Sequence, residues 1–194
     1  MMNMNTGITF WSGKKEYKSL SNFWECEVVI MDNKVKYVYS SGEHCFHGEK
    51  YRRIGMLCED IDRKNKLLEY SKLFLKGGKF NTALEAKCGG GKKGLELNKN
   101  ELEIWSKICL DVQYEICISK FDRYEEVRED LIKSIGSLLI HSASRCSEKQ
   151  YESRFWEGKL VERDGMKVVI VYFFGMLIQA IWVGFLFVPI PFSL

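Results

Sequence analysis

Alternating apolar and polar positions mark the first part of the chain as short strands. Residues 8–11 form one predicted strand, and Glu25–Ile30 and Val35–Tyr39 form two more, joined by a polar turn at residues 31–34. Alternation with a period of two is typical of a strand that buries one face, and two such runs around a short turn predict a hairpin. The sequence therefore predicts a small N-terminal β-hairpin or sheet.

From Ser40 onward the spacing of apolar residues becomes helical. Ser40 and Glu43 match the S-x-x-E capping box, which predicts a helix that begins at about Ser41. Three further helices are predicted, at Cys58–Ser71, Asn98–Phe121 and Glu125–Ile135.

The predicted helix at residues 98–121 carries an apolar stripe that should face the core. Its members are Leu102, Trp105, Cys109, Val112 and Ile116. Glycine-rich segments at residues 77–79 and 88–94 predict loops. With the N-terminal strands, this order predicts a compact, mainly helical α+β domain.

Composition narrows the class of protein. The chain has 194 residues, enough for one domain with its own core, and its net charge of +3 does not predict a protein that coats nucleic acid. Its seven cysteines are scattered without a C-x-x-C pair, which indicates reduced thiols and a cytoplasmic protein. The first residues, MMNMNTGITFW, lack the basic start and apolar core of a signal peptide.

The segment YSSGEHCFHGEK at residues 39–50 holds the densest candidate chemistry. On a helix that begins at Ser41, four side chains share one face: Glu43, Phe46, His47 and Lys50. In a cleft, this carboxylate, imidazole and amine suit acid–base and amine chemistry. The alternative is structural: Glu43 caps the helix and Lys50 is a solvated charge.

A metal site and a phosphate loop are both poorly supported. His44 and His47 lie three residues apart near Cys45, but the remaining histidine, His141, is distant, so we expect no metal and no cofactor. Gly91-Lys92 is followed by lysine instead of serine or threonine, so the P-loop pattern fails.

Two stretches place aromatic rings beside polar groups. These are Asn22-Phe23 in the N-terminal part and Arg154-Phe155-Trp156 near the end. Such pairs suit a planar heterocycle, through stacking on the ring and hydrogen bonds to its edge. Burial of these aromatics in the core is the alternative interpretation.

In order along the chain, these stretches resemble the NADAR family, also called the YbiA-like N-glycosidases. The resemblance covers about residues 8–165 and rests on four segments: Phe10 with Ser21-Asn22-Phe23, the helix Ser41–Lys50, Trp105 with Lys120-Phe121, and Phe155–Leu160. It implies a YbiA-like α+β domain over residues 1–165 that cleaves N-glycosidic bonds between a ribose and a base. The implied substrates are phosphoribosylamino pyrimidine intermediates of riboflavin biosynthesis, or ADP-ribosyl-guanine in nucleic acid.

The resemblance also implies roles for individual residues. Glu43 and Lys50 would be catalytic, the carboxylate stabilising an oxocarbenium-like sugar or transferring a proton, and the neutral amine attacking the anomeric carbon. The implied substrate-binding residues are Asn22, Phe23, Phe46, His47, Trp105, Arg154 and Trp156. An impaired domain of this kind would instead be a nucleotide- or ADP-ribose-binding module.

The chain departs from the family pattern at three places. His47 stands where the family has glutamine, Ser153 stands where it has aspartate, and no closing G-x-N-x-L-G segment follows Gly165. Residues 166–194 form an apolar tail, and Val168–Val188 carries no charge and is long enough to span a bilayer. This tail is interpreted as a membrane anchor, an apolar core segment or the product of a shifted reading frame.

Overall fold

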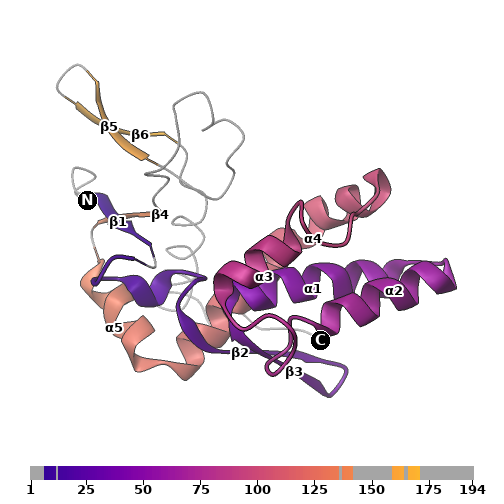
Figure 1. Ribbon diagram of the computed structural model, residues 1–194. Coiled ribbons are helices and arrows are strands. Elements are labelled where there is room, and N and C mark those ends of the chain that lie inside the picture. The colour runs from indigo at the N-terminus through magenta and orange to yellow at the C-terminus, as the bar shows by residue number, and fades with distance from the viewer. Residues whose placement is uncertain (1–6, 12, 136, 142–158, 164–165, 171–194) are drawn as a thin grey trace. The chain divides into compact units, whose positions relative to one another are not determined.

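The computed structural model describes residues 7–11, 13–135, 137–141, 159–163 and 166–170 (Figure 1). The chain divides into two compact units, one made of Met1–Ser21 with Tyr124–Leu194 and the other of Asn22–Arg123. Helices and short strands are both present, so the predicted α+β class is confirmed. The unit Asn22–Arg123, called the central unit below, contains the predicted helix that carries Glu43, His47 and Lys50.

The central unit begins with the predicted hairpin. Strand β2 (Glu25–Asp32) pairs antiparallel with β3 (Val35–Ser41), and Val29 lies opposite Val38. Asn33 and Lys34 have φ angles of 45° and 69°, the left-handed conformation that a tight two-residue hairpin turn requires. The prediction of a hairpin is confirmed, and both strands are longer than predicted.

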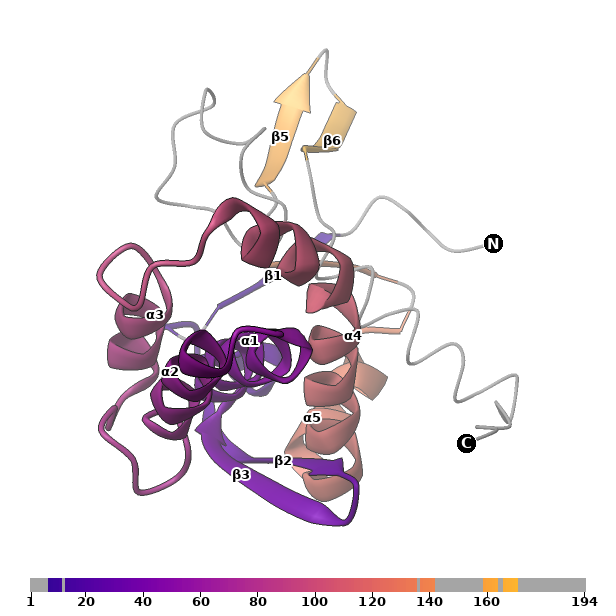
Figure 2. The ribbon, with the colours of Figure 1, turned by 90° about the vertical axis from the view of Figure 1, so that its right-hand side faces the viewer.

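Four helices follow this hairpin in the central unit. They are α1 (Gly42–Leu57), α2 (Ile61–Lys72), α3 (Ala83–Gly90) and α4 (Lys99–Arg123). In Figure 2 the view runs along α1, with α2 and α3 on one side of it and α4 on the other. The core of the unit is formed by these buried side chains: Val28, Ile30, Tyr39, Cys45, Tyr51, Ile54, Leu67, Phe74, Ala86, Val112 and Ile116.

The predicted start of α1 is correct to one residue, but the predicted capping box is wrong. Ser40 still belongs to β3, because the strand continues until Ser41 pairs with Glu25. Ser41 is the residue that caps α1, and its hydroxyl accepts a hydrogen bond from the backbone N–H of His44 at 3.3 Å. Glu43 is therefore free of the capping role that the structural alternative gave it.

Two other boundaries also differ from the prediction. Helix α2 begins at Ile61 instead of Cys58, because Asp60 caps it by accepting from the N–H of Arg63 at 2.8 Å. Residues 88–90 were predicted as loop but belong to α3. Thr82 and Glu85 form a complete capping box that starts this helix.

Helix α4 confirms the predicted helix, with a correction to its apolar stripe. Val112 and Ile116 are fully buried, whereas Leu102 is 52% exposed. The neighbouring Glu101 is buried and forms an ion pair with Arg63. In the first turn of α4, the buried side chain is therefore Glu101 and not Leu102.

The other unit contains short paired strands. Strand β1 (Gly7–Phe10) pairs in parallel with β4 (Leu138–His141), and β5 (Lys159–Arg163) pairs antiparallel with β6 (Met166–Ile170). The 3-10 helix η1 (Lys18–Leu20) contacts α5 (Glu125–Lys133), where the hydroxyl of Ser19 donates to the carboxylate of Asp130. The β5–β6 pair joins residues on both sides of the predicted boundary at residue 165.

Candidate functional site

The start of α1 is fixed by contacts from the segment before β2. The backbone carbonyl of Asn22 accepts a hydrogen bond from the N–H of Glu43 at 3.0 Å. The side-chain amide of Asn22 exchanges two hydrogen bonds with that of Gln113 on α4, at 2.8 and 3.2 Å. Asn22, predicted to bind the edge of a base, therefore ties the first turn of α1 to α4.

Glu43 and His47 meet on the predicted face of α1. His47 Nε2 lies 3.3 Å from Glu43 Oε2, and the two side chains are only 13% and 14% exposed. Burial is the main cause that lowers the pKa of His47, although Glu43 opposes it. His47 Nδ1 is buried and makes no hydrogen bond within the described residues.

Lys50 completes this face one turn further along. Its side chain is 8% exposed, and Nζ donates a hydrogen bond to the backbone carbonyl of Gly90 at the end of α3. No carboxylate of the described residues forms an ion pair with it, and burial lowers the pKa of Lys50 from 10.5 to about 8. A larger share of this amine is therefore neutral at neutral pH than of an ordinary lysine.

Helix α3 closes over this face, which the sequence reasoning missed. A Cβ atom on Gly90 would lie 2.1 Å from Cγ and Nδ1 of the His47 ring, so only glycine allows this approach. The T-x-x-E pattern at Thr82 and Glu85 could have identified the helix. The approach of Gly90 brings a backbone carbonyl within reach of Lys50.

The predicted aromatic residues are found at different places in the central unit. Phe46 packs edge-on against Trp105 of α4, with ring centroids 4.9 Å apart. Phe23 lies under the amine of Lys87, which is 5.1 Å from the ring centroid. Arg154 and Trp156 lie outside the described residues, and their predicted roles stay predictions.

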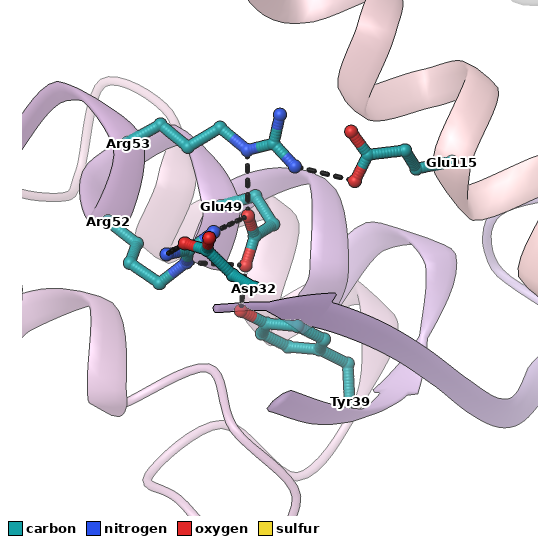
Figure 3. Close-up of polar contacts among 6 residues, drawn as sticks. All are labelled: Asp32, Tyr39, Glu49, Arg52, Arg53 and Glu115. Carbon is teal, nitrogen blue, oxygen red and sulfur yellow. Dashed lines mark hydrogen bonds and ion pairs between the residues drawn. The ribbon is translucent and has the colours of Figure 1, made fainter. Parts of the chain in front are cut away.

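A neighbouring side of α1 carries a buried charge network that the sequence reasoning also missed (Figure 3). Glu49 is fully buried and accepts hydrogen bonds from Tyr39 at 2.6 Å, from Arg52 at 2.8 and 2.7 Å, and from Arg53 at 2.8 Å. Burial raises the pKa of Glu49, but these hydrogen bonds outweigh it and hold the pKa below its ordinary value. The E-x-x-R-R spacing was the available signal.

The two arginines connect this network to other elements. Arg52 pairs with Asp32 at the end of β2 at 2.6 Å, and Arg53 pairs with Glu115 of α4 at 2.5 Å. Together these contacts fix α1 against the hairpin and α4.

The described residues show neither an arranged metal site nor a membrane-spanning helix. Among the described residues, no group of three histidines, cysteines or acids is arranged to hold a metal ion. The ring of His44 instead bonds the Ser41 hydroxyl at 2.8 Å and the Phe80 carbonyl at 3.1 Å. None of the described helices combines the length and hydropathy needed to cross a bilayer. The first three residues of Val168–Val188 belong to β6, and the rest lies outside the described residues.

Comparison with known proteins identifies the fold. No protein family model matches the sequence. The chain is similar to the NMR structure of the E. coli protein YbiA, with a TM-score of 0.53 and 15% sequence identity over 98% of this chain and 93% of that one. It is also 25% identical to Protein irg-1 of Caenorhabditis elegans, in an alignment of 137 residues that covers 54% of this chain. The chain spans 64% of the length of that worm protein. The chain thus has a YbiA-like fold.

Proposed function

From the YbiA-like fold, we propose that this protein is an N-glycosidase that hydrolyses the bond between the C1′ carbon of a ribose and the nitrogen of a base. The observation that carries the proposal is the environment of Lys50. Its amine is buried, has a pKa of about 8, and lies on the same face of α1 as Glu43 and His47. A lysine without a carboxylate partner in such a place has the features of an activated nucleophile.

The reaction would begin with attack of the neutral Lys50 amine on C1′. The carbon–nitrogen bond to the base breaks, its electron pair leaves with the base nitrogen, and a proton neutralises that nitrogen. The attacking nitrogen gives up a proton, and the C1′–O4′ bond then breaks, its electron pair leaving with O4′, which takes up a proton. The opened ribose is thereby joined to Lys50 as a protonated Schiff base. Water hydrolyses this imine, which releases the sugar and restores the amine.

Glu43 and His47 would act on charge and protons during this step. A carboxylate near C1′ stabilises the positive character that the sugar develops as the bond to the base weakens. His47 lies 3.3 Å from Glu43 and would orient it, and its buried Nδ1, which makes no hydrogen bond in the described part of the chain, is one further hydrogen-bonding position. The proposed roles are thus a nucleophile, a stabilising carboxylate and an imidazole that positions it.

The substrate would be a phosphoribosylamino pyrimidine or an ADP-ribosyl-guanine, the latter in nucleic acid. Phe23, Phe46 and Trp105 would contact the base or ribose, as would Asn22 and Trp156. Arg154 or a nearby lysine would meet the phosphate. No cofactor enters this reaction.

A second candidate function is a module that binds a nucleotide or ADP-ribose without turnover. The absence of a closing G-x-N-x-L-G segment after Gly165 favours it. The apolar tail would then tether this module to a membrane.

An HPLC assay that measures the free base released from each of the two substrates separates the two functions. We expect wild-type protein to release base from one of them, and Lys50→Ala and Glu43→Gln to lose that activity. Lys66→Ala, which removes an exposed lysine from α2, is the matched control and should keep it. Retained turnover in both site variants refutes the proposed mechanism, and binding without turnover in wild type supports the module.

A further inference from the structure

A basic turn follows α3 directly, beside the carbonyl that Lys50 contacts. The N–H of Gly94 donates to the carbonyl of Gly91 at 3.0 Å, so Lys92 and Lys93 are the two central residues of the turn. A Cβ atom on Gly94 would lie 1.7 Å from the carbonyl oxygen of Gly89. This close approach requires glycine and holds the turn against the end of α3.

The turn presents its two lysines close to the candidate nucleophile. Lys92 and Lys93 are exposed, and neither forms an ion pair within the described residues. Gly90, which accepts the hydrogen bond from Lys50, is two residues before Lys92, so their Cα atoms are at most about 7.6 Å apart. The backbone that carries these two exposed lysines therefore lies near the buried amine.

A third lysine, Lys87, belongs to the same region. It is exposed on α3, its Nζ lies 5.1 Å from the centroid of the Phe23 ring, and it has no ion pair within the described residues. Its charge also contributes to lowering the pKa of His47, which places it near the face of α1 that carries Glu43 and His47. The region thus combines an aromatic ring with positive charge that forms no ion pair among the described residues.

We propose that Lys87, Lys92 and Lys93 form an anion site that binds the phosphate of the ribosyl substrate. This inference rests on the proposed function, because Lys50 Nζ then marks the position of C1′ and the phosphate extends from the other end of the ribose. Lysine recognises phosphate as a compact charge with several donors. The site gives the protein its selectivity for phosphorylated over unphosphorylated ribose.

The two proposed substrates supply this anion differently. A phosphoribosylamino pyrimidine carries a phosphate monoester, whereas ADP-ribose carries a pyrophosphate in the corresponding position. Both are anions that exposed lysines attract, and the attraction weakens as salt screens it. Comparison of ribose 5-phosphate with ADP-ribose distinguishes the two sources.

Borohydride trapping tests the site without requiring the natural base. Ribose 5-phosphate or ribose, in its open aldehyde form, condenses with Lys50 with loss of water, and borohydride reduces the imine to a stable amine that peptide mapping locates. We expect half-maximal trapping of ribose 5-phosphate to need roughly tenfold more sugar in the triple variant Lys87→Gln/Lys92→Gln/Lys93→Gln. Trapping of ribose should not change.

The control variant changes exposed lysines elsewhere in the central unit. Lys66→Gln/Lys99→Gln on α2 and α4 should leave the preference for ribose 5-phosphate intact. Equal trapping of both sugars by wild-type protein, or an unchanged preference in the triple variant, overturns the anion site.

Calorimetry separates failure of this inference from failure of the proposed function. If Lys50 traps neither sugar, the nucleophilic mechanism is wrong, and binding of ribose 5-phosphate and of ADP-ribose still tests the lysines. Weaker binding of at least one of these two ligands by the triple variant supports the anion site, and the more strongly affected ligand identifies the source. Unchanged binding of both ligands overturns the site.

Discussion

Replacing Lys50 by methionine should stabilise the protein while abolishing its proposed chemistry. The pKa of Lys50 falls from 10.5 to about 8 on folding. Because each pKa unit corresponds to about 1.4 kcal/mol, the protonated amine costs the folded state roughly 3 kcal/mol at neutral pH. Methionine removes this cost but leaves the Gly90 carbonyl without its donor, a loss of about 1 kcal/mol. The expected net gain is roughly 2 kcal/mol in the free energy of unfolding.

The stability difference between wild type and Lys50→Met should also change with pH in a defined direction. Between about pH 8 and 10.5 the unfolded chain binds a proton at Lys50 that the folded protein does not bind. The stability of wild-type protein should therefore rise, relative to the variant, as pH increases through this window. The advantage of Lys50→Met should shrink by pH 10.5.

Chemical denaturation followed by tryptophan fluorescence measures both effects. Lys66→Met, which replaces an exposed lysine on α2, is the control and should change neither the stability at pH 7 nor its pH dependence by more than about 0.5 kcal/mol. If Lys50→Met is less stable than wild type at pH 7, and the difference between them is constant with pH, Lys50 does not carry a buried charge and is not an activated amine.

Contacts around α1 and α3 make three more outcomes testable. Glu49→Gln should lower the free energy of unfolding by about 3–5 kcal/mol, because the buried Arg52 and the partly buried Arg53 lose their shared carboxylate. The surface variant Glu69→Gln should lower it by less than about 1 kcal/mol, and equal losses in denaturant would refute the network. Because hydrogen bonding holds the pKa of Glu49 below 4.5, the stability it contributes is present above pH 4.5 and lost below it. The difference between wild type and Glu49→Gln should therefore narrow in acid, and a constant difference in denaturation at several pH values would contradict this. Gly90→Ala should cost about 1–3 kcal/mol and reduce base release, because its methyl group meets the His47 ring. Gly91→Ala, whose Cβ atom would lie 3.2 Å from the carbonyl oxygen of Lys87, should cost less.

The hairpin and the face of α1 were predictable because each depends on local spacing. A period of two identified both strands, and positions i, i+4 and i+7 placed Glu43, His47 and Lys50 on one side of a helix. The capping residue was wrong by one position because the pairing of Ser41 with Glu25 extends β3, and that pairing joins residues distant in sequence.

The contacts that give the candidate site its character were not predictable from spacing. The approach of Gly90 to His47 depends on how α3 packs on α1, and a glycine run resembles a loop unless its helical partner is known. The parallel pairing of β1 with β4 likewise joins two segments that lie far apart in the sequence. Such long-range pairings leave no periodic signal in one sequence.

The neighbouring residues Glu49 and Lys50 illustrate how α1 tolerates a buried amine that forms no ion pair within the described residues. Lys50 costs the fold roughly 3 kcal/mol at neutral pH, which alone would favour rotation of the helix to expose it. One residue earlier, Glu49 is bonded to Tyr39, Arg52 and Arg53, and breaking such a network costs about 3–5 kcal/mol. Rotation that released Lys50 would break these bonds, so the network outweighs the cost of the amine and keeps it on the face with Glu43.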